Sequence, residues 1–249
     1  MARQKGIIKI KGKLGDLSFY KTQDGHLVRE KGGVDASRIA SDPAFIRTRE
    51  NGAEFGSSAS SGKLVRSTLR PLMMTASDGR VTARLTKRMT EIKNLDATSL
   101  RGERNVGVAI ALPTAKALLK GFNFNNRAVL GSILFKPFQV ATATGVITIS
   151  NLVPINDIAI PQGATHISIK GAWAKVGFTD NTSEIEYTNV ENLPIDATSN
   201  NITLTPTAVP SGTGTSLYLL QVEFFQEVNG QQYSLKNGAY NALSVVEVN

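Results

Sequence analysis

Apolar and polar residues alternate near the start of the chain, between residues 6 and 31. Ile8 and Ile10 are flanked by lysines, and Asp24-Gly25 provides the residues of a tight hairpin turn. This pattern predicts a three-stranded meander with one basic face, formed by Lys9, Lys11, Lys13 and Lys21. A sheet this thin must lie on helices of its own domain or on a neighbouring subunit. Both arrangements agree with the sequence.

The segment that begins at Asp42-Pro43 predicts a long helix, because an N-cap residue is followed by proline at the first helical position. The helix interior contains Gly52, Gly56 and Gly62 together with a run of serine and alanine. Each interior glycine costs about 1 kcal/mol relative to alanine. We therefore expect this surface to press against another backbone, in the same chain or in a second copy. The predicted buried positions here are Phe45, Phe55, Leu64, Leu69 and Leu72.

A second helix is predicted after the turn at residues 77–79. The apolar residues there are Val81, Leu85, Met89 and Ile92, at steps of four, four and three. This is the spacing of residues on one buried face of a helix. The opposite face is basic, with Arg80, Arg84, Lys87, Arg88 and Lys93. Residues 96–105 lack such periodicity, so we predict a boundary there between a domain of residues 1–105 and a domain of residues 106–249.

The second of these domains is expected to consist of eight or nine short strands separated by turns rich in glycine, asparagine and proline. The clearest turn is Asn229-Gly230, which predicts a tight hairpin. Such spacing is typical of an antiparallel β-sandwich, Ig-like or jelly-roll. The predicted fold class is therefore α+β, with an N-terminal β-hairpin or meander plus helices, followed by the β-sandwich.

The amino-acid composition limits the classes of protein to which this chain can belong. Hydrophobic residues make up 41% of the 249 residues and charged residues 19%, as in folded proteins. The chain has no cysteine, which excludes disulfides and thiolate chemistry. No apolar run is long enough for a membrane span or placed as a secretory signal. The expected location is the cytoplasm, or a particle assembled there and released by lysis.

Charge is distributed unevenly. Residues 1–105 contain 21 Lys and Arg against 11 Asp and Glu, whereas residues 106–249 contain 7 against 9. One interpretation is that the basic half faces nucleic acid or an acidic surface of a partner copy; the other is a solvated basic helix face. The candidate contacts for nucleic acid or an acidic partner are Lys9, Lys11, Lys13, Arg84 and Arg88.

Motifs for catalysis are absent from the sequence. The two histidines, His26 and His166, fall in different predicted domains, and no nucleophile elbow, phosphate loop or zinc-binding helix motif occurs. We therefore predict a protein that is not an enzyme, with no catalytic residue, metal site, cofactor or small-molecule substrate. One alternative is a ligand-binding sandwich with exposed aromatic residues such as Trp173 or Tyr187 at its site.

Three segments are similar to proteins of a known group. They are GKLGDLSFYKTQDGHLVREKGGVDASRIASDPAFIRTRENGAEFG (Gly12–Gly56), GATHISIKGA (Gly163–Ala172) and EFFQEVNGQQYSLKNGAYNAL (Glu223–Leu243). They resemble an uncharacterised family of proteins of similar length from Bacteroidota-type bacteria. The resemblance implies a phage- or prophage-related structural protein and brings no established activity.

These observations favour a self-assembling structural protein that forms a filament, a tube or a shell from copies of itself. Its predicted assembly contacts are Gly52, Gly56, Gly62, Phe19 and Tyr20. The main alternative is a nonspecific nucleic-acid-binding protein that uses the basic N-terminal half, with no membrane partner in either case.

Overall fold

The computed structural model describes residues 2–30 and 32–249. The chain forms two compact units, Met1–Arg49 and Glu50–Asn249. Their boundary falls inside the long helix α2 (Ile46–Thr68).

The predicted boundary at residues 96–105 lies inside the second unit. That segment is held there by a buried carboxylate, Asp96, which accepts hydrogen bonds from the backbone N–H groups of Thr98, Ser99 and Asn105. The segment is polar because it wraps around this carboxylate, not because it links two domains.

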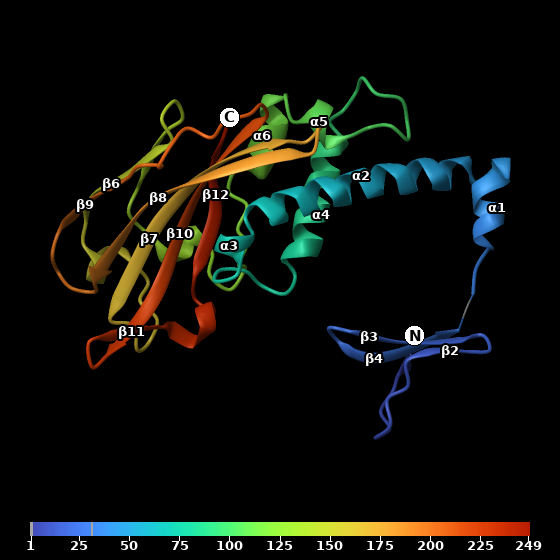
Figure 1. The fold of residues 1–249 in the computed structure, drawn as a ribbon, viewed down its shortest axis with the longest axis horizontal. Coiled ribbons are helices and arrows are strands. Elements are labelled where there is room, and N and C mark those ends of the chain that lie inside the picture. Colours follow the sequence, from blue (N-terminus) through green and yellow to red (C-terminus); the bar gives the residue numbers. More distant parts are fainter. Residues whose placement is uncertain (1, 31) are drawn as a thin grey trace. The chain divides into compact units, whose positions relative to one another are not determined.

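The first unit contains an antiparallel sheet with the order β1-β4-β3-β2, which confirms the predicted meander and adds β1 as an edge strand (Figure 1). Its elements are β1 (Ala2–Arg3), β2 (Gly12–Leu14), β3 (Leu17–Thr22), β4 (Gly25–Glu30), α1 (Ala36–Ser41) and the 3-10 helix η1 (Pro43–Phe45). The predicted helix start is also confirmed. The Asp42 carboxylate accepts a hydrogen bond from the Ala44 N–H at 2.9 Å, and Pro43 begins η1, which leads into α2.

The second unit combines short helices with two antiparallel sheets. After α2 its helices are α3 (Arg70–Met73), α4 (Val81–Lys93), α5 (Val106–Ala109), α6 (Pro113–Leu119), α7 (Leu130–Ile133), α8 (Pro154–Asp157) and the 3-10 helix η2 (Leu235–Gly238). Its strands are β5 (Gln139–Ala141), β6 (Val146–Leu152), β7 (His166–Gly177), β8 (Thr182–Pro194), β9 (Asn200–Leu204), β10 (Thr215–Val228), β11 (Gln231–Ser234) and β12 (Ala242–Val248). The predicted α+β class is therefore correct.

A five-stranded sheet forms the middle layer of this unit (Figure 1). Its strand β10 pairs with β7 along one side and with β11 and β12 along the other. Side chains of β10 alternate between two cores, as strand geometry requires. Leu217 and Leu219 pack with residues of α2, α4 and α6, whereas Tyr218 and Leu220 pack with the three-stranded sheet β5-β6-β9.

This alternation explains why the helices and the sheets belong to one unit. The two sheets form the predicted sandwich-like pair, and α4 covers the other face of the larger sheet. The predicted apolar stripe of α4 is confirmed, because Leu85, Met89 and Ile92 are fully buried and Val81 is nearly so. The helices thus cover apolar side chains of the larger sheet that the two sheets alone would leave exposed to solvent.

Candidate functional site

The sheet of the first unit has two chemically different faces. In an antiparallel sheet, directly paired residues lie on the same face. Leu17 pairs with Leu14 and Glu30, and Phe19 pairs with Val28. We call the face that contains these side chains the apolar face. Its residues are Ala2, Gly12, Leu14, Leu17, Phe19, Lys21, His26, Val28 and Glu30.

Within the described part of the first unit the apolar face is partly open: Phe19, Val28 and His26 are partly exposed, and the Nδ1 atom of His26 is buried. No residue within 2–30 or 32–49 is buried. Leu14 is 67% exposed and Leu17 is 41% exposed. Exposed apolar side chains also precede β2, at Ile7, Ile8 and Ile10. A contiguous exposed apolar patch on a folded protein marks an interaction site more often than a scatter of single residues does.

The two ends of the apolar face carry opposite charge. At the end formed by the turn between β2 and β3 lie Asp16 and Glu30. At the other end lies the Lys21–His26 pair. Desolvation, together with the positive charge of Lys21, Lys11 and Lys9, lowers the pKa of His26. Asp24 lies in the turn between β3 and β4, next to this end.

The opposite face of the sheet is polar and basic. Tyr20 pairs with Leu27, and the Arg29 guanidinium lies 5.5 Å from the centre of the Tyr20 ring. Lys13 pairs with Ser18 on this face. The predicted single basic face is therefore wrong for Lys13 and Lys21, which lie on opposite faces. The predicted contacts Phe19 and Tyr20 are likewise separated, because adjacent strand residues point to opposite sides.

The glycines of α2 have different surroundings. Gly52 and Gly56 are exposed, and a Cβ added at either position would meet nothing within 4 Å. Gly62 is buried, and a Cβ there would lie 3.7 Å from Met89 Cγ and from Thr86 Oγ1 of α4. Gly62 is therefore a packing contact within this chain, which corrects its prediction as an assembly contact. Gly52 and Gly56 remain on an open helix surface.

The buried side of α2 contains a carboxylate that the sequence pattern did not reveal. Glu54 is 3% exposed and forms ion pairs with Lys93 Nζ at 2.5 Å and Arg104 Nε at 2.7 Å. It also accepts the Gly102 N–H at 2.8 Å. Hydrogen bonds from Arg104, opposed by burial and aided by Lys93, lower the pKa of Glu54 from 4.5 to about 2. Phe55, predicted to be buried, is 60% exposed because its neighbour Glu54 occupies the inward position.

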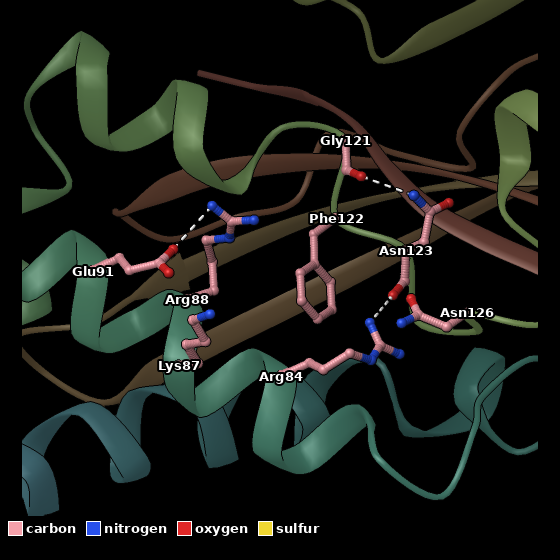
Figure 2. Close-up of a pocket in the computed structure, with 8 residues that line it drawn as sticks. All are labelled: Arg84, Lys87, Arg88, Glu91, Gly121, Phe122, Asn123 and Asn126. Atoms are coloured by element: carbon pink, nitrogen blue, oxygen red, sulfur yellow. Dashed lines mark hydrogen bonds and ion pairs between the residues drawn. The ribbon is translucent and has the colours of Figure 1, made fainter.

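The predicted cations Arg84 and Arg88 line a pocket of about 330 Å³ between α4 and residues 121–126 (Figure 2). The Arg84 guanidinium already has ion-pair and hydrogen-bond partners within this chain. Its guanidinium pairs with Asp78 and donates to the carbonyl oxygens of Asn123 and Phe124. Arg88 pairs with Glu91, a carboxylate that also lines the pocket, at 3.0 Å. Arg84 therefore joins α4 to the loop before α7, and its prediction as a phosphate contact is corrected.

A second basic groove, of about 590 Å³, lies along the end of α2, α3 and the start of α4. Its cations Lys63, Arg66 and Arg70 form no ion pair in the described part of the chain. The Nη1 atom of Arg66 is buried without a hydrogen-bond partner. The three cations are spaced by three and four residues, so they lie on one side of the segment formed by α2 and α3. This spacing can be read directly from the sequence.

The structure gives less support to an aromatic ligand site, a metal site or a membrane span. Trp173 is 4% exposed within the core, which argues against its predicted role at a ligand site, and Tyr187 is half-buried and packs against the core. Among residues 2–30 and 32–249, no three acidic or histidine side chains gather in a way that would hold a metal ion. In the same residues no helix has the length and apolar character of a membrane span.

Comparison with known proteins identifies no relative. No family model, no curated protein and no solved structure matches the chain.

Proposed function

We propose that this protein is a structural protein that assembles from copies of itself and has no catalytic activity. The observation that supports the proposal is a sheet whose apolar face exposes Leu14 and Leu17 and has no buried residue among those that the structure describes. A small sheet with one apolar face needs a packing partner for stability in water, and a second copy is a partner that is always present. The phage-related origin implied by the resemblance stays a prediction.

Replacing Leu17 with lysine is expected to convert assembled protein to monomer. The new charge pairs with Glu30 on the neighbouring strand, so the sheet itself is retained while the apolar face is disrupted. Size-exclusion chromatography with light scattering should give a mass well above 26.7 kDa for the parent chain and 26.7 kDa for Leu17→Lys.

The matched control for this experiment is Ser18→Glu. Ser18 lies on the same strand but on the basic face, where a carboxylate would pair with Lys13 and Arg29. This variant should keep the mass of the parent. A parent chain that is monomeric at every concentration would contradict the proposed function.

Nucleic-acid binding is the second candidate function, and the unpaired cations of the α2–α3 groove favour it. Salt should weaken binding of a labelled single-stranded oligonucleotide, with a log–log slope of about −2 for three phosphate contacts. Arg70→Gln should make this slope shallower by about 0.7. Arg88→Gln, which removes a cation already paired with Glu91, should leave it unchanged. Retention that does not depend on salt would argue against this function.

A further inference from the structure

We propose that the apolar face packs face to face against the same face of a second copy, related by a two-fold axis that crosses β3 and β4 at Phe19 and Val28. This inference rests on the proposed self-assembly and names the contact that carries it. Two-fold contacts use one surface twice, so the surface must be complementary to itself. The arrangement of rows on this face meets that requirement.

Three rows of side chains cross the apolar face. The central row is apolar, with Phe19 paired to Val28 and flanked by Ala2. One outer row contains Leu17 and Glu30, and the other contains Lys21 and His26. This two-fold axis sets the central row of one copy against the central row of the other. Each outer row of one copy then faces the opposite outer row of its partner. Apolar side chains then meet in the middle, as between the sheets of a sandwich.

Charge distinguishes this arrangement from other two-fold pairings. Exchange of the outer rows sets β4 of one copy opposite β4 of the other, so Glu30 lies opposite His26 and diagonally across from Lys21, and opposite charges lie near each other at both ends of the contact. An axis parallel to the strands would instead place Lys21 rows against each other. Like charges held face to face are unfavourable, and this selects the axis that crosses the strands.

The size of the face indicates how strong one such contact can be. β3 and β4, with six residues each, are about 20 Å long, whereas β1 and β2 have two and three residues; at about 4.8 Å between strands the face is therefore smaller than roughly 300 Å². Stable interfaces bury about 800 Å² on each partner. A single pairing is therefore weak, and we expect it to populate fully only at high concentration or where further contacts join the same copies.

Site-specific crosslinking tests the pairing in the full-length chain. The sequence contains no cysteine, so one introduced thiol is the only site of reaction. Val28→Cys places a thiol at the axis, and Leu27→Cys places one on the opposite face of the same strand. A short bismaleimide is needed, because sheets packed face to face lie about 10 Å apart and a disulfide cannot span that distance. Val28→Cys should give crosslinked dimer, and Leu27→Cys should give none.

Charge reversal in the Val28→Cys background tests the exchanged rows. Lys21→Glu and Glu30→Lys should each lower the yield of crosslinked dimer about threefold to tenfold, because each change acts twice in a two-fold contact. The double variant Lys21→Glu/Glu30→Lys should recover the parental yield. A merely unfolded sheet would not recover in the double variant.

The outcomes separate this inference from the proposed function. Large assemblies without a Val28→Cys crosslink, or with crosslinking through Leu27→Cys instead, would overturn the pairing and leave self-assembly in place. Equal crosslinking by the single and double charge variants would overturn the exchanged rows. A monomer at all concentrations, with the face covered by the chain's own second unit, would overturn both.

Discussion

Replacing Glu54 with glutamine is expected to lower the free energy of unfolding of the second unit by about 3–5 kcal/mol. The substitution keeps the shape of the side chain but leaves Lys93, whose side chain is 6% exposed, as a buried cation without its partner. Arg104 loses the same carboxylate. The effect is large because an uncompensated buried charge costs far more than the ion pair itself contributes. Urea denaturation at neutral pH measures it directly.

Glu50→Gln is the matched control for this variant. Glu50 lies one turn earlier on α2 and pairs with Arg101, whose side chain is 51% exposed, at 3.1 Å. Exposed ion pairs contribute at most about 1 kcal/mol, so the control should unfold within that range of the parent. Equal losses from Glu50→Gln and Glu54→Gln would contradict the role assigned to burial.

The loss at Glu54 should also depend on pH. The pKa of this carboxyl is about 2 in the folded chain against 4.5 as its ordinary value. A depressed folded-state pKa contributes stability that is complete above the unfolded value and disappears as pH falls through the folded value. The difference between parent and Glu54→Gln should therefore be constant above about pH 5 and shrink towards pH 2. A difference that grows on acidification would contradict this account.

Gly238→Ala is expected to destabilise the second unit by about 2–4 kcal/mol. Gly238 has a φ of +77°, and a Cβ would lie 2.2 Å from the carbonyl oxygen of Thr75, a backbone atom that also accepts a hydrogen bond from Asn241 Nδ2 at 3.1 Å. The left-handed conformation costs about 1 kcal/mol for alanine, and forced displacement of the packed segments adds about 1–3 kcal/mol. Thermal and urea unfolding both measure this loss.

Gly230→Ala separates these two contributions. Gly230 has the same φ of +77°, but a Cβ there would meet nothing within 4 Å. Its substitution should cost only the conformational term, about 1 kcal/mol. Equal losses of stability in the two alanine variants would show that contact between the added Cβ and the Thr75 carbonyl oxygen does not contribute to the effect.

Local patterns in the sequence predicted local structure well. The stripe of α4 became the buried face of that helix, and Asn229-Gly230 joins β10 to β11 with both residues at positive φ, as a tight hairpin turn requires. The capping signal at Asp42 placed the start of the helical segment. Each of these features depends on residues a few positions apart, whose chemistry alone decides the outcome.

Features that depend on distant partners escaped prediction. Glu54 faces inward only because Lys93 and Arg104, about 40 and 50 residues later, satisfy its charge, and no spacing rule connects them. Arg84 looked available for phosphate because its acceptors, the carbonyl oxygens of residues 123 and 124, carry no sequence signature. Lys13 and Lys21 were assigned to one face because the turn between β2 and β3 was not resolved in the sequence. That turn pairs Lys13 with Ser18, so odd-numbered residues of β2 share a face with even-numbered residues of β3.

The late position of β10 in the chain has a consequence during synthesis. This central strand and its neighbour β12 are made only after residue 214, so the core of the second unit cannot close until the ribosome has nearly finished. The sheet of the first unit is complete after Glu30. At 5–20 residues per second, about 200 further residues take roughly 10–40 s. The sheet of the first unit can therefore form on the ribosome well before the second unit is able to fold.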